Sequence, residues 1–456
     1  MKLRTLIVVA LLTLPLTLQA SYTLVPSKRV HSKIDTLPKN SIADMKNIPQ
    51  DPAHYAKQVT AMSPKKQHKL DKEYNKRYFS PWSLKRVDKT STQITWPFRA
   101  VTKQIIYDSN HKVIKKSTYR QWIQNSNYKS LNSVAKYAIT TRHCNLHAFP
   151  MSRAFYRNPK KAGEGFPFDY NQNSSYHINT PLFLSHYSLD KKWAFVRGST
   201  AYGWIHISSI AIVDKKFIKQ FKNDNYSIVV RDNLSLQSDA KPLSIVKIGS
   251  IFPKTEYTIL NKEKQKIKKE GYLFATRMSN GDAKLSIVTT PNPHIIAKKP
   301  IAFTANNVAM ITQQFYNEPY GWGGLLETRD CSSMTKDYLS VFGMFVRRNS
   351  GKQAQDGKYI NIKGYKKAQK KKRILSKAKP FRSLLFVPGH IVLYLGEYKN
   401  EPVIMHTYWG VRLKDTSKYI LARTVITTTE PGKELQNIKE ESKLIHTLKG
   451  IVSFGE

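Results

Sequence analysis

Cysteine is scarce in this sequence, with two residues, Cys144 and Cys331, among 456. Two cysteines are too few for a disulfide framework of the kind that holds small secreted domains together. Acidic residues are also few, because 31 Asp and Glu stand against 75 Lys and Arg, a formal charge of +44. This excess favours an anionic partner through long-range attraction, although a well-solvated surface without a specific partner explains it equally well.

Apolar runs of membrane-spanning length are absent after the first residues of the chain. The N-terminal apolar stretch follows Lys2 and Arg4, contains Pro15 and ends near Ala20, which is the order of a secretory signal peptide. We predict removal of residues 1–20, export to the periplasm or beyond, and no stable membrane span afterwards. An uncleaved anchor is the alternative. Export argues against nucleic acid as the partner and favours anionic envelope polymers.

The residue pattern changes along the chain and predicts an α+β protein of several domains. Residues 21–135 are basic and rich in turn formers, with a helix that ends at the turn of Pro81, and are predicted to form an N-terminal clip. Residues 136–214 and 215–298 consist of short alternating runs broken by Pro, Gly and Asn, which indicate two small β-barrels. Residues 299–456 mix helical and strand patterns and form the last domain.

The stretch "YGWGGLLETRDCSSMTKDYLSVFGMF" holds Cys331 between a glycine-rich turn and a predicted helix. Asp330 occupies the position of an N-cap, and the helix is expected to end or bend at Gly343. Because the first turn of a helix has unpaired N–H groups and the positive end of the dipole, we expect this position to favour a thiolate. The apolar residues that follow are spaced so that they lie on one face of a helix; they are Met334, Tyr338, Val341, Phe342 and Phe345.

A base for this thiol is available in "PGHIVLYLGEYKNEPVIMHTYWG". Two strand-like runs flank the polar loop "GEYKNE", which predicts a hairpin. If the turn is centred on Tyr398, His390 and His406 face each other directly, with Cβ atoms about 5 Å apart. One imidazole can then orient the other, provided that the register does not slip by one residue.

The segment "RHCNLH" raises the question of a metal site. On a strand, His143 and His147 share a face while Cys144 points away, and the further ligands of a structural zinc site are not evident. No metal and no cofactor are therefore predicted. Cys144 and Cys331 lie in domains predicted to be separate, so both thiols are expected to be free.

A basic run, "KGYKKAQKKKRILSKAKP" (residues 363–380), lies between the thiol and the histidines. A solvated loop is the simplest interpretation of such a run. The alternative is that it holds the protein against anionic envelope material. The residues concerned are Lys366, Lys367, Lys370, Lys371, Lys372 and Arg373.

These motifs resemble a known family. "PYGWGG", "RDCSS", "FGMFVRRNSGKQ", "PGHIVLYLG" and "MHTYWG" are similar to the NlpC family of papain-like cell-wall cysteine peptidases. The resemblance extends to members with an N-terminal stabilising clip and two bacterial SH3-like domains, through "KLDKEYNKRYFSPW" and "FPFDYNQNSSYHINTPLFLSHYSLDKKWAFVRG". It implies a papain-like domain preceded by two SH3-like barrels and a clip.

The resemblance also implies roles for individual residues. Cys331 corresponds to the nucleophile, His390 to the general base and His406 to the residue that orients this base. Tyr320, the Tyr of the family's Tyr-x-x-Gly-Gly turn, is implied to bind the oxyanion with the backbone N–H of Cys331. The implied activity is endopeptidase cleavage of peptidoglycan stem peptides or muropeptides, at the bond between γ-D-glutamyl and a diamino acid.

The positions beside the nucleophile, Asp330 and Ser332, help relatives to bind the amino group of substrates with a free N-terminus. Two other function classes stay open. The chain is alternatively a cell-wall binding protein whose peptidase domain is inactive or blocked by its clip, or an amidase or acyltransferase of the same fold. Retention of Cys331, His390, His406 and Tyr320 favours the peptidase, because an inactive domain has no chemical need for all four.

Overall fold

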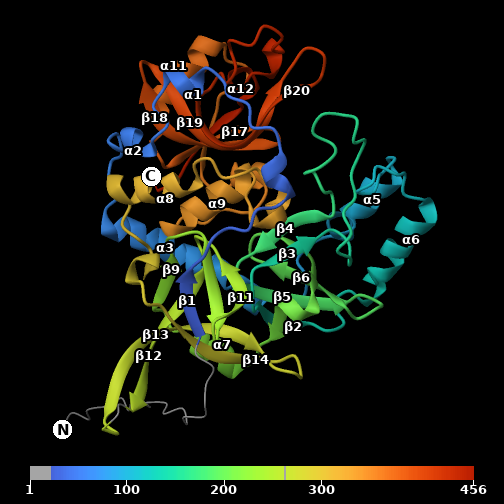
Figure 1. Cartoon of the computed structure of the whole chain (residues 1–456), viewed down its shortest axis with the longest axis vertical. Coiled ribbons are helices and arrows are strands. Elements are labelled where there is room, and N and C mark those ends of the chain that lie inside the picture. The colour runs from blue at the N-terminus through green and yellow to red at the C-terminus, as the bar shows by residue number, and fades with distance from the viewer. Residues whose placement is uncertain (1–21, 261–262, 456) are drawn as a thin grey trace, which may run out of the picture.

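The computed structural model describes residues 22–260 and 263–455. Within these ranges the strands form three sheets, and no helix is both long and apolar enough to cross a membrane. Figure 1 shows the C-terminal domain in orange and red above two β domains in green and yellow, with the blue N-terminal arm running along them. The predicted signal peptide, residues 1–20, lies outside the described residues.

The first β domain is built on a sheet with the strand order β4-β3-β7-β6-β5-β2-β8. Its core is made of small and branched side chains such as Leu146, Leu182 and Ile205, all fully buried. The strands are β2 (Lys136–Thr140), β3 (Cys144–His147), β4 (Gln172–Tyr176), β5 (Pro181–Tyr187), β6 (Trp193–Gly198), β7 (Tyr202–His206) and β8 (Ile210–Ile212).

The second β domain takes a strand from the N-terminal arm. β1 (Tyr22–Pro26) pairs with β10 in antiparallel and with β14 in parallel orientation, and buries Leu24 in the domain core. The start of the predicted clip therefore completes this sheet, while the domain boundaries stay a prediction. The other elements are α7 (Lys215–Phe221), β9 (Tyr226–Val229), β10 (Leu234–Ser238), β11 (Lys241–Val246), β12 (Ile251–Leu260), β13 (Lys266–Arg277), β14 (Ala283–Thr289) and β15 (Ile296–Lys298).

The C-terminal domain packs helices against a sheet of order β16-β21-β17-β18-β19-β20. Its strands are β16 (Lys358–Asn361), β17 (Ser383–Val387), β18 (His390–Tyr398), β19 (Glu401–Arg412), β20 (Lys418–Thr428) and β21 (Gly450–Ser453). Its helices are α8 (Ala305–Phe315), α9 (Cys331–Val341), α10 (Ser350–Gln353), α11 (Lys367–Lys377) and α12 (Leu444–Thr447).

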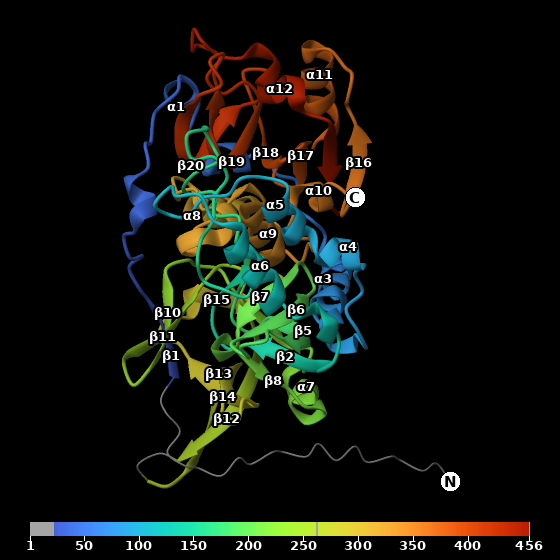
Figure 2. The ribbon, with the colours of Figure 1, turned by 90° about the vertical axis from the view of Figure 1, so that its right-hand side faces the viewer.

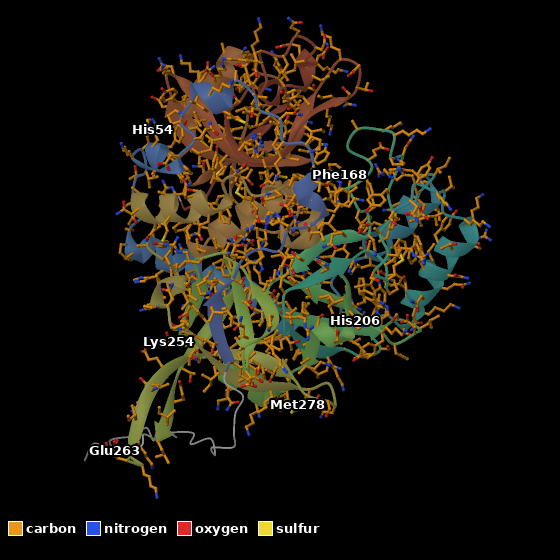
Figure 3. All side chains as sticks on the ribbon, in the orientation of Figure 1. His54, Phe168, His206, Lys254, Glu263 and Met278 are labelled. Carbon is orange, nitrogen blue, oxygen red and sulfur yellow. The ribbon has the colours of Figure 1, made fainter. Side chains whose placement is uncertain are left out.

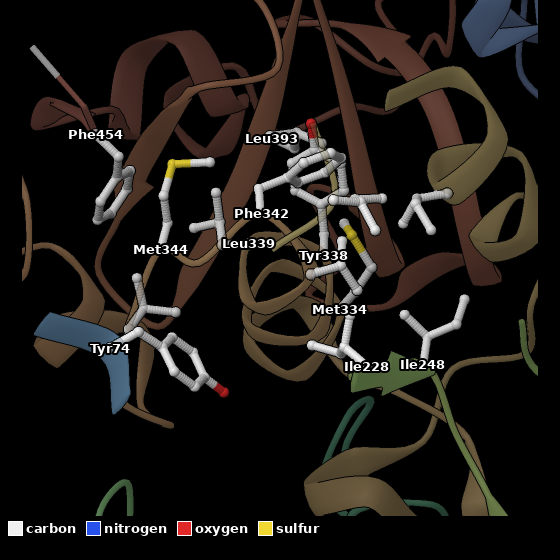
Figure 4. Close-up of a cluster of buried hydrophobic side chains, with 14 of the residues drawn as sticks. Tyr74, Ile228, Ile248, Met334, Tyr338, Leu339, Phe342, Met344, Leu393 and Phe454 are labelled. Atoms are coloured by element: carbon white, nitrogen blue, oxygen red, sulfur yellow. The ribbon is translucent and has the colours of Figure 1, made fainter. Parts of the chain in front are cut away.

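Helix α9 lies at the centre of the molecule rather than at its edge. Figure 4 shows Met334 and Tyr338 between Leu393 of the C-terminal sheet and Ile228 and Ile248 of the second β domain. These side chains have at most 1% of their surface exposed. The helix that carries Cys331 at its first position is therefore fixed by packing on both sides.

A buried guanidinium also ties α9 to the second β domain. Arg329, which is 1% exposed, donates to Asp232, to Glu318 and, at 2.7 Å, to Asp337. Asp337 in turn accepts from His177 of the first β domain at 2.9 Å. Burial acts to raise the pKa of Asp337, but the positive charges of Lys336, His177 and Arg329 hold it well below its usual range. All three domains thus meet directly behind the N-terminus of α9.

The N-terminal arm covers the edge of the C-terminal sheet. Strand β20 is the last strand of that sheet, and an uncovered edge strand is a template for unwanted pairing. The backbone N–H of Asn40 donates to Ile420, and Arg423 donates to the carbonyl oxygen of Lys39. The predicted clip helix is α3 (Pro64–Tyr78), followed by a 3-10 turn at Ser80–Ser83. The other arm helices are α1 (Asp44–Asn47), α2 (Pro52–Ala56), α4 (Ser91–Ile94), α5 (Trp96–Thr102) and α6 (Lys116–Asn125).

The prediction of a solvated loop over residues 363–380 is wrong, because α11 occupies most of this segment. Ile374 is fully buried, and the ammonium of Lys370 donates to the carbonyl oxygens of Ile445, His446 and Leu448. The basic residues of this run therefore serve partly as structural donors. Lys367 and Lys371 pair with Glu430, and Arg373 packs on the ring of Tyr365.

Candidate active site

Cys331 is the first residue of α9, as the sequence predicts. The carboxylate of Asp330 caps the helix by accepting from the backbone N–H groups of Ser332 and Ser333 at 3.1 and 2.9 Å. Ser333 closes a capping box, since its hydroxyl accepts from the backbone N–H of Asp330 at 2.8 Å. This local arrangement fixes the backbone on which the thiol stands. Cys331 as a whole is buried, with 8% of its surface exposed.

The turn before the helix brings Tyr320 to the same place. Gly323 and Gly324 have φ of 63° and 86°, where other residues are strained, and they lie against strand β4 of the first β domain. A Cβ on Gly323 would come within 2.3 Å of the carbonyl oxygen of Gln172. Burial raises the pKa of Tyr320, and the nearby charges of Asp330 and Cys331 act in the same direction. The phenol therefore stays protonated.

The predicted register of the histidine hairpin is wrong. The chain turns at Lys399 and Asn400, which both have left-handed φ of 50° and 62°, and not at Tyr398. A bulge between Tyr394 and Gly396 then moves the strand pairing back by one residue, so that the register beyond it differs from the predicted one by two residues. Both features add residues that alternating hydrophobicity does not reveal.

The two imidazoles nevertheless meet. Beyond the bulge Leu393 pairs with Met405, and continuing this register places His406 opposite Val392. His390 and His406 are therefore diagonal neighbours on one face of the sheet, since side chains two residues apart along a strand share a face. His390 Nε2 lies 2.9 Å from His406 Nδ1.

A chain of hydrogen bonds fixes the tautomers of both rings. The hydroxyl of Thr427 donates to the carbonyl oxygen of Thr428 at 2.8 Å, so it accepts from Nε2–H of His406 at 3.1 Å. Nδ1 of His406 then carries a lone pair and accepts from Nε2–H of His390. The remaining nitrogen of His390, Nδ1, is left unprotonated and able to accept a proton.

Electrostatics keep the thiol and the imidazoles neutral in the free protein. Burial, assisted by the Asp330 carboxylate, raises the pKa of Cys331 to about 12, although N–H donors of Ile391 and Ser332 act against it. Burial lowers the pKa of His390 to about 4. The expectation that the helix start favours a thiolate is not met, because burial raises the pKa of the thiol and Asp330, which occupies N–H groups of the first turn, repels negative charge.

Asp330 and Ser332 lie inside a saturated network. The guanidinium of Arg348 donates to both Asp330 oxygens, at 3.0 and 2.6 Å, and to the hydroxyl of Ser332 at 2.7 Å. The backbone N–H of Gly323 donates to Asp330 as well, at 3.0 Å. The pKa of Asp330 stays low despite burial, chiefly because of Arg348. Asp330 thereby joins the glycine turn, the helix start and Arg348.

Aromatic side chains line the approach to the thiol. The loop between β3 and β4, residues 148–171, crosses from the first β domain to the C-terminal domain (Figure 2). Phe168, labelled in Figure 3 at this junction, packs against Trp409 with ring centroids 5.0 Å apart. Trp409 packs against Tyr320 at 5.6 Å. The first β domain thus helps to enclose the site.

Sequence reasoning missed two residues that touch this constellation. Thr427 lies in "VITTTE", where nothing distinguishes it from its neighbours. Tyr408 stacks on His406 with ring centroids 4.6 Å apart and an interplanar angle of 21°. Tyr408 could have been identified from the sequence, because residues two apart along a strand lie on the same face and Tyr408 follows His406 by two.

Metal ligands are not assembled in the described ranges, where no group of three or more His, Cys, Asp or Glu side chains is arranged to hold an ion. Cys144 and Cys331 are both free and buried.

Comparison with known families agrees with this arrangement. Residues 317–429 match the NlpC/P60 family, residues 9–130 match the NLPC_P60 N-terminal stabilising domain, and residues 154–206 match an SH3 domain of the SH3b1 type. No curated protein sequence matches the chain.

One solved structure shares the fold over nearly its whole length. An NlpC/P60 endopeptidase from Photobacterium damselae subsp. piscicida is similar with a TM-score of 0.79 at 23% identity, over 92% of this chain and 99% of that one. An NlpC/P60 family protein from Bacillus cereus matches 70% of this chain and 100% of its own at 12% identity, with a TM-score of 0.37. The chain therefore carries an NlpC/P60 domain of papain-like fold, with a stabilising domain and an SH3 domain ahead of it.

Proposed function

We propose that this chain is an exported peptidoglycan hydrolase, a cysteine endopeptidase that cleaves stem peptides between γ-D-glutamyl and a diamino acid. The match of residues 317–429 to the NlpC/P60 family supports a peptidase of the cell wall. The finer choice of bond rests on the sequence resemblance. The observation that carries the chemistry is the ordered hydrogen-bond chain from Thr427 through His406 to His390, which leaves a basic nitrogen on His390.

In the proposed reaction His390 Nδ1 takes the proton of Cys331 as the sulfur attacks the substrate carbonyl carbon. The π electrons of the carbonyl move to its oxygen and form a tetrahedral oxyanion. The Tyr320 hydroxyl and the backbone N–H of Cys331 donate to this oxyanion, and each such donor contributes about 3 kcal/mol to the transition state. Concerted transfer suits this site, because the thiol and the imidazole are both neutral at rest.

Collapse of the oxyanion breaks the carbon–nitrogen bond, and the imidazolium of His390 gives its proton to the leaving amine. A thioester between Cys331 and the γ-glutamyl carbonyl remains. Water then attacks this thioester while His390 takes its proton, and the thiolate leaves and is reprotonated. His406 stabilises the transient imidazolium by accepting from Nε2–H throughout.

The roles predicted for Asp330 and Ser332 remain part of the proposal. Both residues lie next to the thiol, and their oxygens are engaged with Arg348. A substrate amine that binds there has to share the Asp330 carboxylate with this guanidinium. Such sharing is feasible because a carboxylate offers about four lone-pair positions.

A second candidate function is a non-catalytic or autoinhibited cell-wall binding protein. The small exposure of Cys331, 8%, favours this reading. A peptidase also needs an enclosed site, such as the one that the loop of residues 148–171 helps to form, because water has to be excluded during thioester formation. Burial of Cys331 alone therefore does not distinguish a peptidase from a binding protein.

Mass spectrometry of muropeptides incubated with the purified protein separates them. We expect wild type, and a Cys144→Ala control that lacks the other buried cysteine, to release fragments cut after γ-D-glutamyl. Cys331→Ala should release none. Identical fragment profiles for wild type and Cys331→Ala would exclude the peptidase for these substrates.

We also propose a periplasmic or secreted location and contact with anionic envelope polymers. Of the six basic residues singled out in this run, Lys366 and Lys372 are the exposed lysines that pair with no acid in the described residues. Replacing both with Gln should weaken sedimentation with sacculi at low salt. Sedimentation equal to that of wild type would assign this surface to solvation only.

A further inference from the structure

Lys418 is a half-buried cation at the start of strand β20. No ion pair or hydrogen bond joins its ammonium to another group in the described part of the chain. The residue opposite it on β19 is Arg412, which is also positive. Burial and Arg412 both lower the pKa of Lys418. A half-buried ammonium without a counter-charge beside it is unfavourable, so its position calls for a partner that the described part of the chain does not supply.

The ammonium lies within the candidate active site. A Cβ on Gly163 would lie 2.9 Å from Lys418 Nζ and 3.9 Å from the ring of Phe168. Phe168 in turn contacts Tyr320, with ring centroids 5.7 Å apart. The charge of Lys418 reaches His390 and lowers its pKa. Lys418 is therefore placed beside the loop of residues 148–171, near enough to His390 to act on its charge.

A second unpaired donor points to the same region. Nε1 of Trp409 is buried and has no hydrogen-bond partner within residues 22–260 and 263–455. Trp409 lies opposite a bulge in β20, where Leu421 and Ala422 together face this one residue of β19. The bulge sets its ring against Phe168 and Tyr320. Both unpaired groups are donors only, which selects an acceptor that carries negative charge.

We propose that Lys418 and Trp409 form a subsite for a carboxylate of the substrate, next to the reacting bond. This inference rests on the proposed peptidase function and specifies its substrate class. A γ-linked glutamyl residue keeps its α-carboxylate free, and the diamino acid carries a carboxylate of its own. The subsite then selects stem peptides with a free carboxylate over peptides in which the same position is amidated.

The free carboxylate is preferred because amidation removes the negative charge that would pair with Lys418. A carboxylate restores the counter-charge of Lys418 and accepts from Trp409, whereas a carboxamide offers a neutral acceptor. Hydrogen bonds to charged groups typically change affinity by roughly 10- to 100-fold. The acid form should therefore be preferred by about this factor in kcat/KM.

The experiment compares three synthetic stem peptides, with both carboxylates free, with only the glutamyl α-carboxylate amidated, or with only the diamino acid amidated. Wild type should cleave one of the amidated peptides at least tenfold less efficiently, which identifies the carboxylate bound. Lys418→Gln should lose rate on the acid form only and bring the acid-to-amide ratio within twofold. Lys418→Arg should keep the ratio, and Trp409→Phe should reduce it partly.

Lys414→Gln is the matched control, because Lys414 is an exposed lysine in the same β19–β20 connection. An acid-to-amide ratio that is equal in wild type and Lys418→Gln would overturn the subsite. If no peptide is cleaved even by wild type, the proposed peptidase fails. Calorimetric binding of the acid and amide peptides to Cys331→Ala, with and without Lys418→Gln, then still decides the subsite.

Discussion

Replacement of Thr427 by Val tests the tautomer assignment on which the proposed base depends. Val has the shape of Thr but cannot accept from Nε2–H of His406, which is fully buried. A buried donor without a partner costs about 1–3 kcal/mol. His406 can avoid this cost by moving its proton to Nδ1, which then donates to His390 Nε2. His390 must in that case carry its own proton on Nδ1, where it cannot accept one from Cys331.

The expected magnitude follows from this competition. A change of about 1.4 kcal/mol in the tautomer preference alters the population ratio tenfold. We therefore expect Thr427→Val to reduce kcat/KM on muropeptides by about tenfold or more, and to slow alkylation of Cys331 by iodoacetamide. Nitrogen-15 chemical shifts of His390 should move from the Nε2–H toward the Nδ1–H form, which a purely structural role of Thr427 would not produce.

Two control variants separate the tautomer effect from loss of stability. Thr427→Ser keeps the hydroxyl and should retain most of the activity. Thr424→Val removes a buried hydroxyl on the same strand that bonds to Thr407 at 2.8 Å and does not touch the imidazoles. It should lower stability by a similar amount without changing kcat/KM. A Thr427→Val rate within twofold of wild type would refute the reasoning.

Further substitutions and pH test other parts of the site. Tyr320→Phe removes an oxyanion donor and should lower kcat about 100-fold with little change in KM, measured by muropeptide turnover. Arg348→Met leaves Asp330 buried without its partner and should lower the free energy of unfolding by about 3 kcal/mol, measured in urea. Burial lowers the pKa of His147 and His186 to about 4 in the folded protein. In the unfolded chain the same imidazoles have a pKa of about 6.5, so the unfolded chain binds protons at a higher pH than the folded protein does. Stability should therefore fall as the pH drops from about 6.5 toward 4, by up to about 3 kcal/mol for each imidazole, and a melting temperature that does not fall over this range would contradict the burial argument.

The local features around the thiol could be predicted from the sequence because short-range chemistry determines them. Asp330 caps α9 through neighbouring N–H groups, and Gly323 is required where the turn has positive φ. The hairpin of β18 and β19 was also predictable, since its two strands are adjacent in sequence. Its register was not, because the left-handed turn at Lys399 and the bulge before Gly396 leave no mark in the alternation of hydrophobic residues.

Features that depend on distant segments were beyond the reach of pattern reasoning. Strand β1 joins the sheet of a domain that begins about two hundred residues later, and its partner β10 is fixed by tertiary packing. The charge of the basic run over α11 predicts a solvated segment. Lys370 is nevertheless buried, because carbonyl oxygens near α12 accept hydrogen bonds from its ammonium. The sequence also could not predict that the ammonium of Lys418 lacks a counter-charge in the described residues, because the loop that carries Gly163 reaches Lys418 only in the folded protein.

The central claim is that Cys331 forms a thioester with the substrate while His390 serves as its base. Intact-mass measurement of the protein, quenched during turnover of a stem peptide, tests this claim directly. We predict an added mass equal to the acyl fragment, located on the peptide that contains Cys331, absent from Cys331→Ala and strongly reduced in His390→Ala. Cleavage of the substrate by Cys331→Ala at the wild-type rate would contradict the account.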